Sequence, residues 1–156
     1  MLIFMASIAL EFASVAADEH VTPDHLTWME ASLRTRLKSL NCNIPLKIDG
    51  IRVTPVIIGQ FATTGRIDLA VICVTDNESL VLIYWGGEFK CADTFQSNGQ
   101  SISVVGKHYI MSHYEAYGGL EPPDIEHEGI NDIILEKASV VQFCHNGTWI
   151  ELTGAD

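Results

Sequence analysis

Basic residues are scarce in this sequence, and they form no cluster. The 156 residues include nine lysines and arginines against twenty aspartates and glutamates, which gives a formal net charge of −11. A surface that binds nucleic acid needs clustered Lys and Arg to neutralise phosphates and release counterions. The composition therefore argues against a nucleic-acid partner, and for the same reason against binding to an anionic membrane surface.

The common catalytic and cofactor-binding motifs are also missing. The sequence has no Gly-x-Ser-x-Gly nucleophile elbow, no Gly-x-x-x-x-Gly-Lys-Ser/Thr phosphate loop and no Gly-x-Gly-x-x-Gly fingerprint. Its six histidines are scattered, and no His-Glu-x-x-His motif places two of them on one helical face. We therefore predict no catalytic residues and no organic cofactor.

No hydrophobic run is long enough to span a membrane. Residues 1–10 are almost wholly apolar, but Glu11 interrupts the run before the roughly twenty residues that a transmembrane helix needs. Val15-Ala16-Ala17, ahead of Asp18, is similar to a signal-peptidase cleavage site. No Lys or Arg precedes Arg34, so the positive n-region is missing, as a truncated start would explain.

These features predict the domain organisation and the compartment. Residues 1–17 are interpreted as a signal peptide and residues 18–156 as one domain, since a chain of this length commonly forms one domain. The predicted location is periplasmic or extracellular, without a stable membrane anchor. The alternative is that the first seventeen residues form a buried helix or strand that opens the fold.

Four cysteines are present, and they are widely spaced at Cys42, Cys73, Cys91 and Cys144. The absence of Cys-x-x-Cys argues against a zinc knuckle or a thioredoxin-type redox pair. In an oxidising compartment two disulfides can form in three connectivities. We favour Cys42 with Cys73, because one follows a predicted helix and the other lies in an apolar strand. Four reduced core cysteines are the alternative.

An amphipathic helix is predicted near the N-terminus of the domain. Thr22-Pro23-Asp24 can open it, because Thr caps, Pro fits the first turn and Asp favours the positive end of the dipole. Asn41 is a typical terminator. Between them, apolar residues recur at helical spacings of three and four, namely Leu26, Met29, Leu33, Leu37 and Leu40. This apolar stripe is interpreted as core packing.

From Arg52 onward the sequence is typical of β-structure. Residues 68–74 and 80–85 are continuous apolar runs, which predicts strands that are buried on both faces. Residues 53–58 form another run, and Pro55 indicates an edge strand there because proline lacks the backbone N–H.

The C-terminal part carries the strongest hairpin signal. Asn146-Gly147 separates residues 139–145 from residues 148–152, and both turn residues accept positive φ. A short strand is predicted for residues 101–105 and a short helix for residues 109–117. One helix followed mostly by strands predicts an α+β fold, a single domain whose N-terminal amphipathic helix packs on a mainly antiparallel β-sheet.

An acidic loop, residues 124–132, is the one candidate ion site. Calcium is a hard cation that binds six to eight oxygens, and Gly129 permits the sharp turn that folds carboxylates inwards. Leu135 stands where an EF-hand has its bidentate Glu, so this is not an EF-hand. A solvated acidic turn is the alternative. The predicted calcium ligands are the carboxylates of Asp124, Glu126, Glu128 and Asp132 and the carbonyl of Ile130.

This loop resembles the calcium loop of FG-GAP and VCBS repeats, which form β-propeller blades in integrin α chains and in secreted bacterial proteins. A second segment, residues 59–71, is similar in its Gly-x-Phe opening, its Gly65 and its Asp68-Leu69-Ala70-Val71 ending. The resemblance implies that this second copy has lost its metal. Three of its residues stand where the family places Asp or Asn ligands, namely Gln60, Ala62 and Thr64.

The resemblance covers two short segments, whereas a propeller needs about four blades or more. More broadly, the stretch from Gly59 to Asp156 looks like a group of uncharacterised bacterial secreted proteins, which implies export and no particular activity. The aromatic pair Tyr84-Trp85 ends an apolar strand. It is interpreted as core packing, with the lining of a sugar- or peptide-binding groove as the alternative.

Together these observations predict an exported, non-enzymatic binding or accessory protein with a protein or carbohydrate partner, stiffened by one calcium ion. Two other functions stay open. One is a small metal-dependent hydrolase that uses the histidines and the acidic loop. The other is an inhibitor or immunity-type partner of an exported enzyme, since an acidic protein complements a basic target.

Overall fold

The computed structural model describes residues 18–88, 90–118, 121 and 123–154, and the predicted signal peptide lies outside these residues. The described part contains eleven strands in three antiparallel sheets and two short α-helices. Within it, no helix is both long and apolar enough to cross a membrane.

Each sheet is built from strands that follow one another along the chain. The first sheet, in the order β1-β2-β3, consists of Glu19–Val21, Ile44–Ile48 and Ile51–Arg52. The middle sheet, in the order β4-β5-β6-β7, consists of Val56–Gly59, Asp68–Val74, Ser79–Tyr84 and Thr94–Gln96. The third sheet, in the order β8-β9-β10-β11, consists of Ser101–Val105, Gly129–Ile134, Ala138–His145 and Thr148–Thr153.

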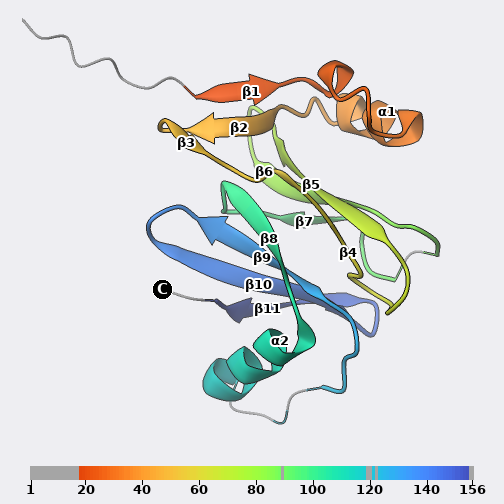
Figure 1. Cartoon of the computed structure of the whole chain (residues 1–156), viewed down its shortest axis with the longest axis vertical. Coiled ribbons are helices and arrows are strands. Elements are labelled where there is room, and N and C mark those ends of the chain that lie inside the picture. The colour runs from red at the N-terminus through yellow and green to blue at the C-terminus, as the bar shows by residue number, and fades with distance from the viewer. Residues whose placement is uncertain (1–17, 89, 119–120, 122, 155–156) are drawn as a thin grey trace, which may run out of the picture.

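The elements are arranged in layers (Figure 1). Helix α1 (Ala31–Ser39) and the first sheet lie at one end, followed by the middle sheet and the third sheet, and helix α2 (Lys107–His113) lies at the other end. The middle and third sheets are both four-stranded meanders, and their first strands β4 and β8 lie side by side. Two hydrogen bonds join β8 to the segment just before β4, from Thr54 N–H to Ser101 Oγ (2.9 Å) and from Ile102 N–H to the Thr54 carbonyl (2.9 Å).

The predicted α+β class is wrong, because the described chain is mostly β. The long N-terminal helix is replaced by a 3₁₀ turn at Pro23–His25 and the short α1, which begins only at Ala31. Leu26 has non-helical dihedral angles (φ −91°, ψ 56°), so the helical turn after Pro23 does not continue. The predicted end is confirmed, since Asn41 adopts φ 55°, a conformation that an α-helix cannot extend through.

The two apolar strands β5 and β6 are buried on both faces, as predicted. Successive side chains of a strand point to opposite faces of its sheet. Ala70 and Ile72 of β5 therefore pack with residues of the third sheet, while Val71 and Cys73 pack with α1 and the first sheet. The middle sheet is the central layer of the molecule, and a third apolar cluster joins the third sheet to α2 around Ile110.

The hairpin predicted at Asn146-Gly147 is confirmed. These residues join β10 to β11 with φ values of 48° and 82°, the left-handed conformation that a two-residue hairpin turn of this type requires. The predicted edge position of the strand near Pro55 is also confirmed. Strand β4 begins at Val56 and forms one edge of the middle sheet.

Two disulfides tie the layers together. The predicted pair Cys42–Cys73 is confirmed, and it joins the segment after α1 to β5. The second pair, Cys91–Cys144, joins the connection between β6 and β7 to strand β10 of the third sheet. Each outer layer is thus linked covalently to the middle sheet or to the loop that leaves it.

Candidate functional site

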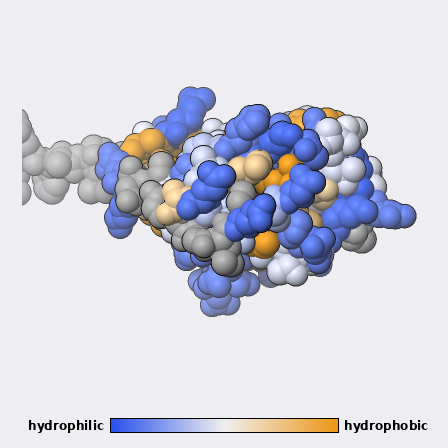
Figure 2. All heavy atoms as spheres, turned by 90° about the horizontal axis from the view of Figure 1, so that it is seen from below, coloured by the Kyte–Doolittle hydropathy of each residue, from blue (hydrophilic) through white to orange (hydrophobic). Residues whose placement is uncertain are grey.

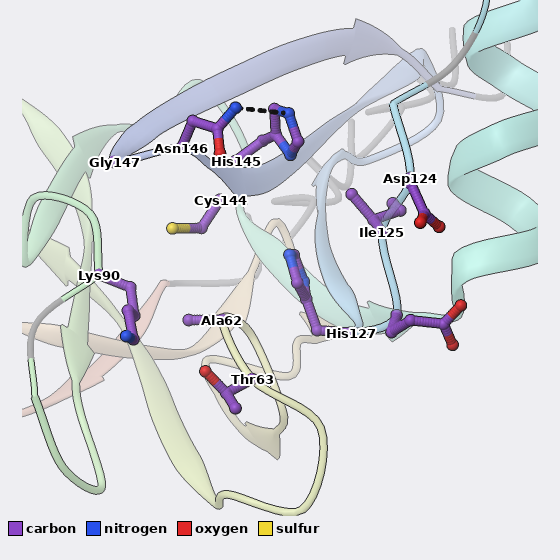
Figure 3. Close-up of a pocket in the computed structure, with 11 residues that line it drawn as sticks. Ala62, Thr63, Lys90, Asp124, Ile125, His127, Cys144, His145, Asn146 and Gly147 are labelled. Atoms are coloured by element: carbon purple, nitrogen blue, oxygen red, sulfur yellow. Dashed lines mark hydrogen bonds between the residues drawn. The ribbon is translucent and has the colours of Figure 1, made fainter.

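A polar hollow of about 410 Å³ lies where loops of the middle and third sheets meet. Its walls come from the β4–β5 loop, the β6–β7 loop, the segment that leads into β9, and the β10–β11 hairpin. Figure 3 shows side chains from all four segments around it. The polar residues that line it are Thr63, Lys90, Asp124, Glu126, His127, His145 and Asn146.

The β4–β5 loop and the segment before β9 are joined by hydrogen bonds. Gln60 N–H donates to Glu128 Oε2 (2.7 Å), and Glu128 N–H donates to the Gln60 carbonyl (2.9 Å). Thr64 Oγ1 donates to the Glu126 carbonyl (2.5 Å). The two segments that resemble each other in sequence thus lie side by side and form adjacent walls of the hollow.

A buried carboxylate holds the β4–β5 loop in shape. Asp68 is 1% exposed, and its oxygens accept hydrogen bonds from Phe61 N–H (3.1 Å) and Gly86 N–H (2.9 Å). The Arg66 guanidinium lies 3.5 Å from the same carboxylate and is largely buried. Asp68 therefore connects both ends of the loop to the loop that follows β6.

Two of the six scattered histidines meet at the hollow. His127 Nδ1 lies 2.8 Å from the Glu128 carbonyl, which can only accept, so Nδ1 carries the proton and Nε2 keeps its lone pair in the neutral ring. His145 Nε2 lies 3.0 Å from the amide nitrogen of Asn146, which donates to it (Figure 3).

Charged side chains of both signs border the hollow. Lys90 and Asp124 lie on opposite sides of it (Figure 3), and neither forms an ion pair with another described residue. Glu126, in contrast, pairs with Lys107 at 2.6 Å. The hydrogen bond and the charge of Lys107 lower the pKa of the Glu126 carboxyl. With respect to the described residues, the hollow therefore offers one unpaired cation and one unpaired anion together with uncharged donors and acceptors.

The structure places the five predicted calcium ligands in different surroundings. Asp124 and Glu126 line the hollow, whereas the Glu128 carboxylate accepts the hydrogen bond from Gln60 N–H. Ile130 and Asp132 are not in a loop but inside strand β9, paired with β8 and β10. Among the residues that the structure describes, no three His, Cys, Asp or Glu side chains are close enough to hold a metal ion. Calcium binding by the acidic loop stays a prediction.

Asp132 stabilises a neighbouring turn. Its carboxylate is 3% exposed and accepts hydrogen bonds from Ser97 Oγ (2.8 Å) and Asn98 N–H (3.2 Å). Burial raises the pKa of the Asp132 carboxyl, and this effect exceeds the opposite effect of the hydrogen bonds. Asp132 thus links β9 to the loop between β7 and β8.

We expect Asp132→Asn to be more stable than the wild type at pH 7. A carboxyl group whose pKa is raised by folding stabilises the fold fully below its unfolded pKa of about 3.9, and the contribution is lost as pH rises through the folded pKa. The neutral amide avoids this loss, so thermal melts of the two proteins should converge near pH 3 and separate towards pH 7. Asp132→Ala should lose about 1–3 kcal/mol, because Ser97 and Asn98 lose their acceptor.

Most of the hollow could not be found from the sequence. The acidic residues and His127 stand in one segment, but Lys90 and His145 lie far from it along the chain and carry no motif. The Cys91–Cys144 disulfide joins the β6–β7 loop, which carries Lys90, to strand β10, which carries His145. Comparisons with protein-family models, with curated proteins and with solved structures found no match for this chain.

Proposed function

We propose that the chain is an exported binding protein and that the hollow between the middle and third sheets binds a small carbohydrate. The observation that carries the proposal is the convergence of loops from both sheets on one polar hollow. Its amide, imidazole, carboxylate, ammonium and hydroxyl groups both donate and accept hydrogen bonds. Neighbouring sugar hydroxyls require this mixture of donors and acceptors.

The rigidity of the walls supports binding. The Asp68 hydrogen bonds fix the β4–β5 loop, the Gln60–Glu128 hydrogen bonds fix the next wall, and the Cys91–Cys144 disulfide fixes the other two. A site whose side chains are held before binding loses less conformational entropy when the ligand arrives. The lining cysteine, Cys144, is oxidised and is therefore no nucleophile.

The disulfides support the proposed location. Disulfides persist in oxidising compartments and are rare in the cytosol. All four cysteines are paired in this protein, and residues 1–17 have the apolar run and the small residues of a signal peptide. A periplasmic or extracellular location accounts for both features.

The proposal predicts saturable binding of a sugar at the hollow. We expect glucose, N-acetylglucosamine or maltose, titrated into ¹⁵N-labelled protein, to shift the amide resonances of residues 124–127 and 145–147. Thr63→Arg, which fills the hollow with a long side chain, should abolish the shifts. The matched control is Thr35→Arg on the exposed face of α1, which should bind like the wild type. Shifts that do not saturate, or that survive in Thr63→Arg, would contradict the proposal.

A further inference from the structure

The chain contains two Asn-Gly sequences, Asn98-Gly99 and Asn146-Gly147, and the structure places them in different surroundings. An asparagine that precedes glycine is prone to spontaneous deamidation, because glycine has no side chain to hinder attack of its backbone nitrogen on the asparagine side chain. From their sequence alone, the two dipeptides should react alike. Any difference between them in the folded protein therefore comes from the fold.

The backbone nitrogen of Gly99 is held in place. Gly99 is buried, and its N–H donates to Ser97 Oγ (3.1 Å). A Cβ added at Gly99 would overlap Asp132 Oδ1, so this carboxylate packs closely on the glycine. Asp132 also accepts hydrogen bonds from Ser97 Oγ (2.8 Å) and Asn98 N–H (3.2 Å). The turn that leads to β8 therefore cannot rearrange without breaking hydrogen bonds to a buried carboxylate.

The backbone nitrogen of Gly147 is unrestrained. Asn146 and Gly147 form the exposed turn between β10 and β11, and Gly147 N–H has no hydrogen-bond partner among the described residues. The Asn146 side chain makes one exposed hydrogen bond, from Nδ2 to His145 Nε2 (3.0 Å; Figure 3). Attack requires the turn to leave its hairpin conformation briefly, and exposed turns open at low free energy.

We propose that Asn146 is a site of spontaneous deamidation and that the fold protects Asn98 from the same reaction. The Gly147 nitrogen attacks Asn146 Cγ, and the new N–C bond closes a succinimide ring. The side-chain amide group leaves as ammonia and takes the proton of the attacking nitrogen. Water then opens the ring at either carbonyl, which gives aspartate or isoaspartate. No oxidant or reductant takes part.

The modification would change one wall of the hollow. Either product replaces an amide, which donates to His145 Nε2, by a carboxylate, which only accepts. The lining, which already includes Asp124 and Glu126, gains a further carboxylate. Isoaspartate also adds a methylene to the main chain, so the two-residue turn cannot keep its geometry. The reaction itself does not depend on whether the hollow binds a sugar.

The test compares the two dipeptides within one protein. Folded wild-type protein is kept at pH 7 and body temperature for several weeks, and peptides from it are analysed by mass spectrometry, which detects the replacement of the amide NH₂ by OH. We expect Asn146 to react at least about ten times faster than Asn98, a ratio that corresponds to about 1.4 kcal/mol in the barrier. Equal rates, or a faster reaction at Asn98, would overturn the proposal.

Two further measurements separate the effect of the fold from that of the sequence. In reduced protein unfolded in urea, both dipeptides should react at similar rates, and a ratio as large as in the folded protein would refute the role of the fold. Ser97→Ala, checked for folding by circular dichroism, frees Gly99 N–H and should speed the reaction at Asn98 but not at Asn146. An unchanged rate at Asn98 would refute the cause that we assign to its protection.

Discussion

Replacing Asp68 by alanine is expected to lower the free energy of unfolding by about 3–5 kcal/mol, because the substitution leaves a largely buried guanidinium without its carboxylate. Arg66 is the residue that loses its partner, and Phe61 and Gly86 lose the acceptor of their backbone N–H groups. Urea denaturation at pH 7, followed by circular dichroism, measures the change.

Asp68→Asn is the matched control for this experiment. The amide keeps one acceptor oxygen of nearly the same size but removes the negative charge, so its loss should be smaller than that of Asp68→Ala. A loss below about 1 kcal/mol in the alanine variant, the value typical of exposed ion pairs, would show that the carboxylate does not organise this loop.

Removal of the Cys91–Cys144 disulfide is expected to cost about 4 kcal/mol, because the bond closes a long loop and so restricts the unfolded chain. The two cysteines are 53 residues apart, against 31 for Cys42 and Cys73. The double variant Cys91→Ala/Cys144→Ala should therefore lose slightly more stability than Cys42→Ala/Cys73→Ala. Chemical denaturation of both variants under non-reducing conditions compares them.

The two disulfides should differ in their effect on binding. Cys144 lines the hollow, and its bond holds the β6–β7 loop against the β10–β11 hairpin. At a temperature where both double variants are folded, sugar-induced shifts should be weakened without Cys91–Cys144 and retained without Cys42–Cys73. Equal binding by the two variants would show that the disulfide does not position the walls of the hollow.

Local signals in the sequence predicted the local structure well. The positive φ values of Asn146 and Gly147 follow from side-chain chemistry that is visible within two residues. The double burial of β5 and β6 follows from apolar runs such as residues 80–85. The helical spacing from Leu26 to Leu40 predicts one continuous helix, and this prediction is wrong because the backbone leaves the helical conformation at Leu26.

The sequence does not predict the surroundings of residues that are positioned by pairing between strands distant along the chain. Asp132 follows three other acidic residues at regular spacing, which indicates a loop, yet β9 has already begun at Gly129. The surroundings of Asp132 are set by strand pairing, because it lies opposite Ile102 of β8 on one side and Val140 of β10 on the other. Tyr84 and Trp85 are a second case, because the sequence does not show that they and residues of α1 line one cavity.

The exterior gives no sign of one dominant contact surface on the face seen from the α2 end. Figure 2 shows mostly hydrophilic residues there, with hydrophobic ones in small separate groups. Large exposed apolar patches are typical of stable protein–protein interfaces.

The order of the disulfides along the chain has a consequence for maturation. The first cysteine pairs with the second and the third with the fourth. A polypeptide that enters an oxidising compartment N-terminus first presents Cys42 and Cys73 to each other before Cys91 arrives. Joining each cysteine to the next one to emerge gives the native connectivity among the three that four cysteines allow. For a chain that enters such a compartment in this order, each disulfide needs an electron acceptor to form, and pairing in the order of emergence needs no isomerase.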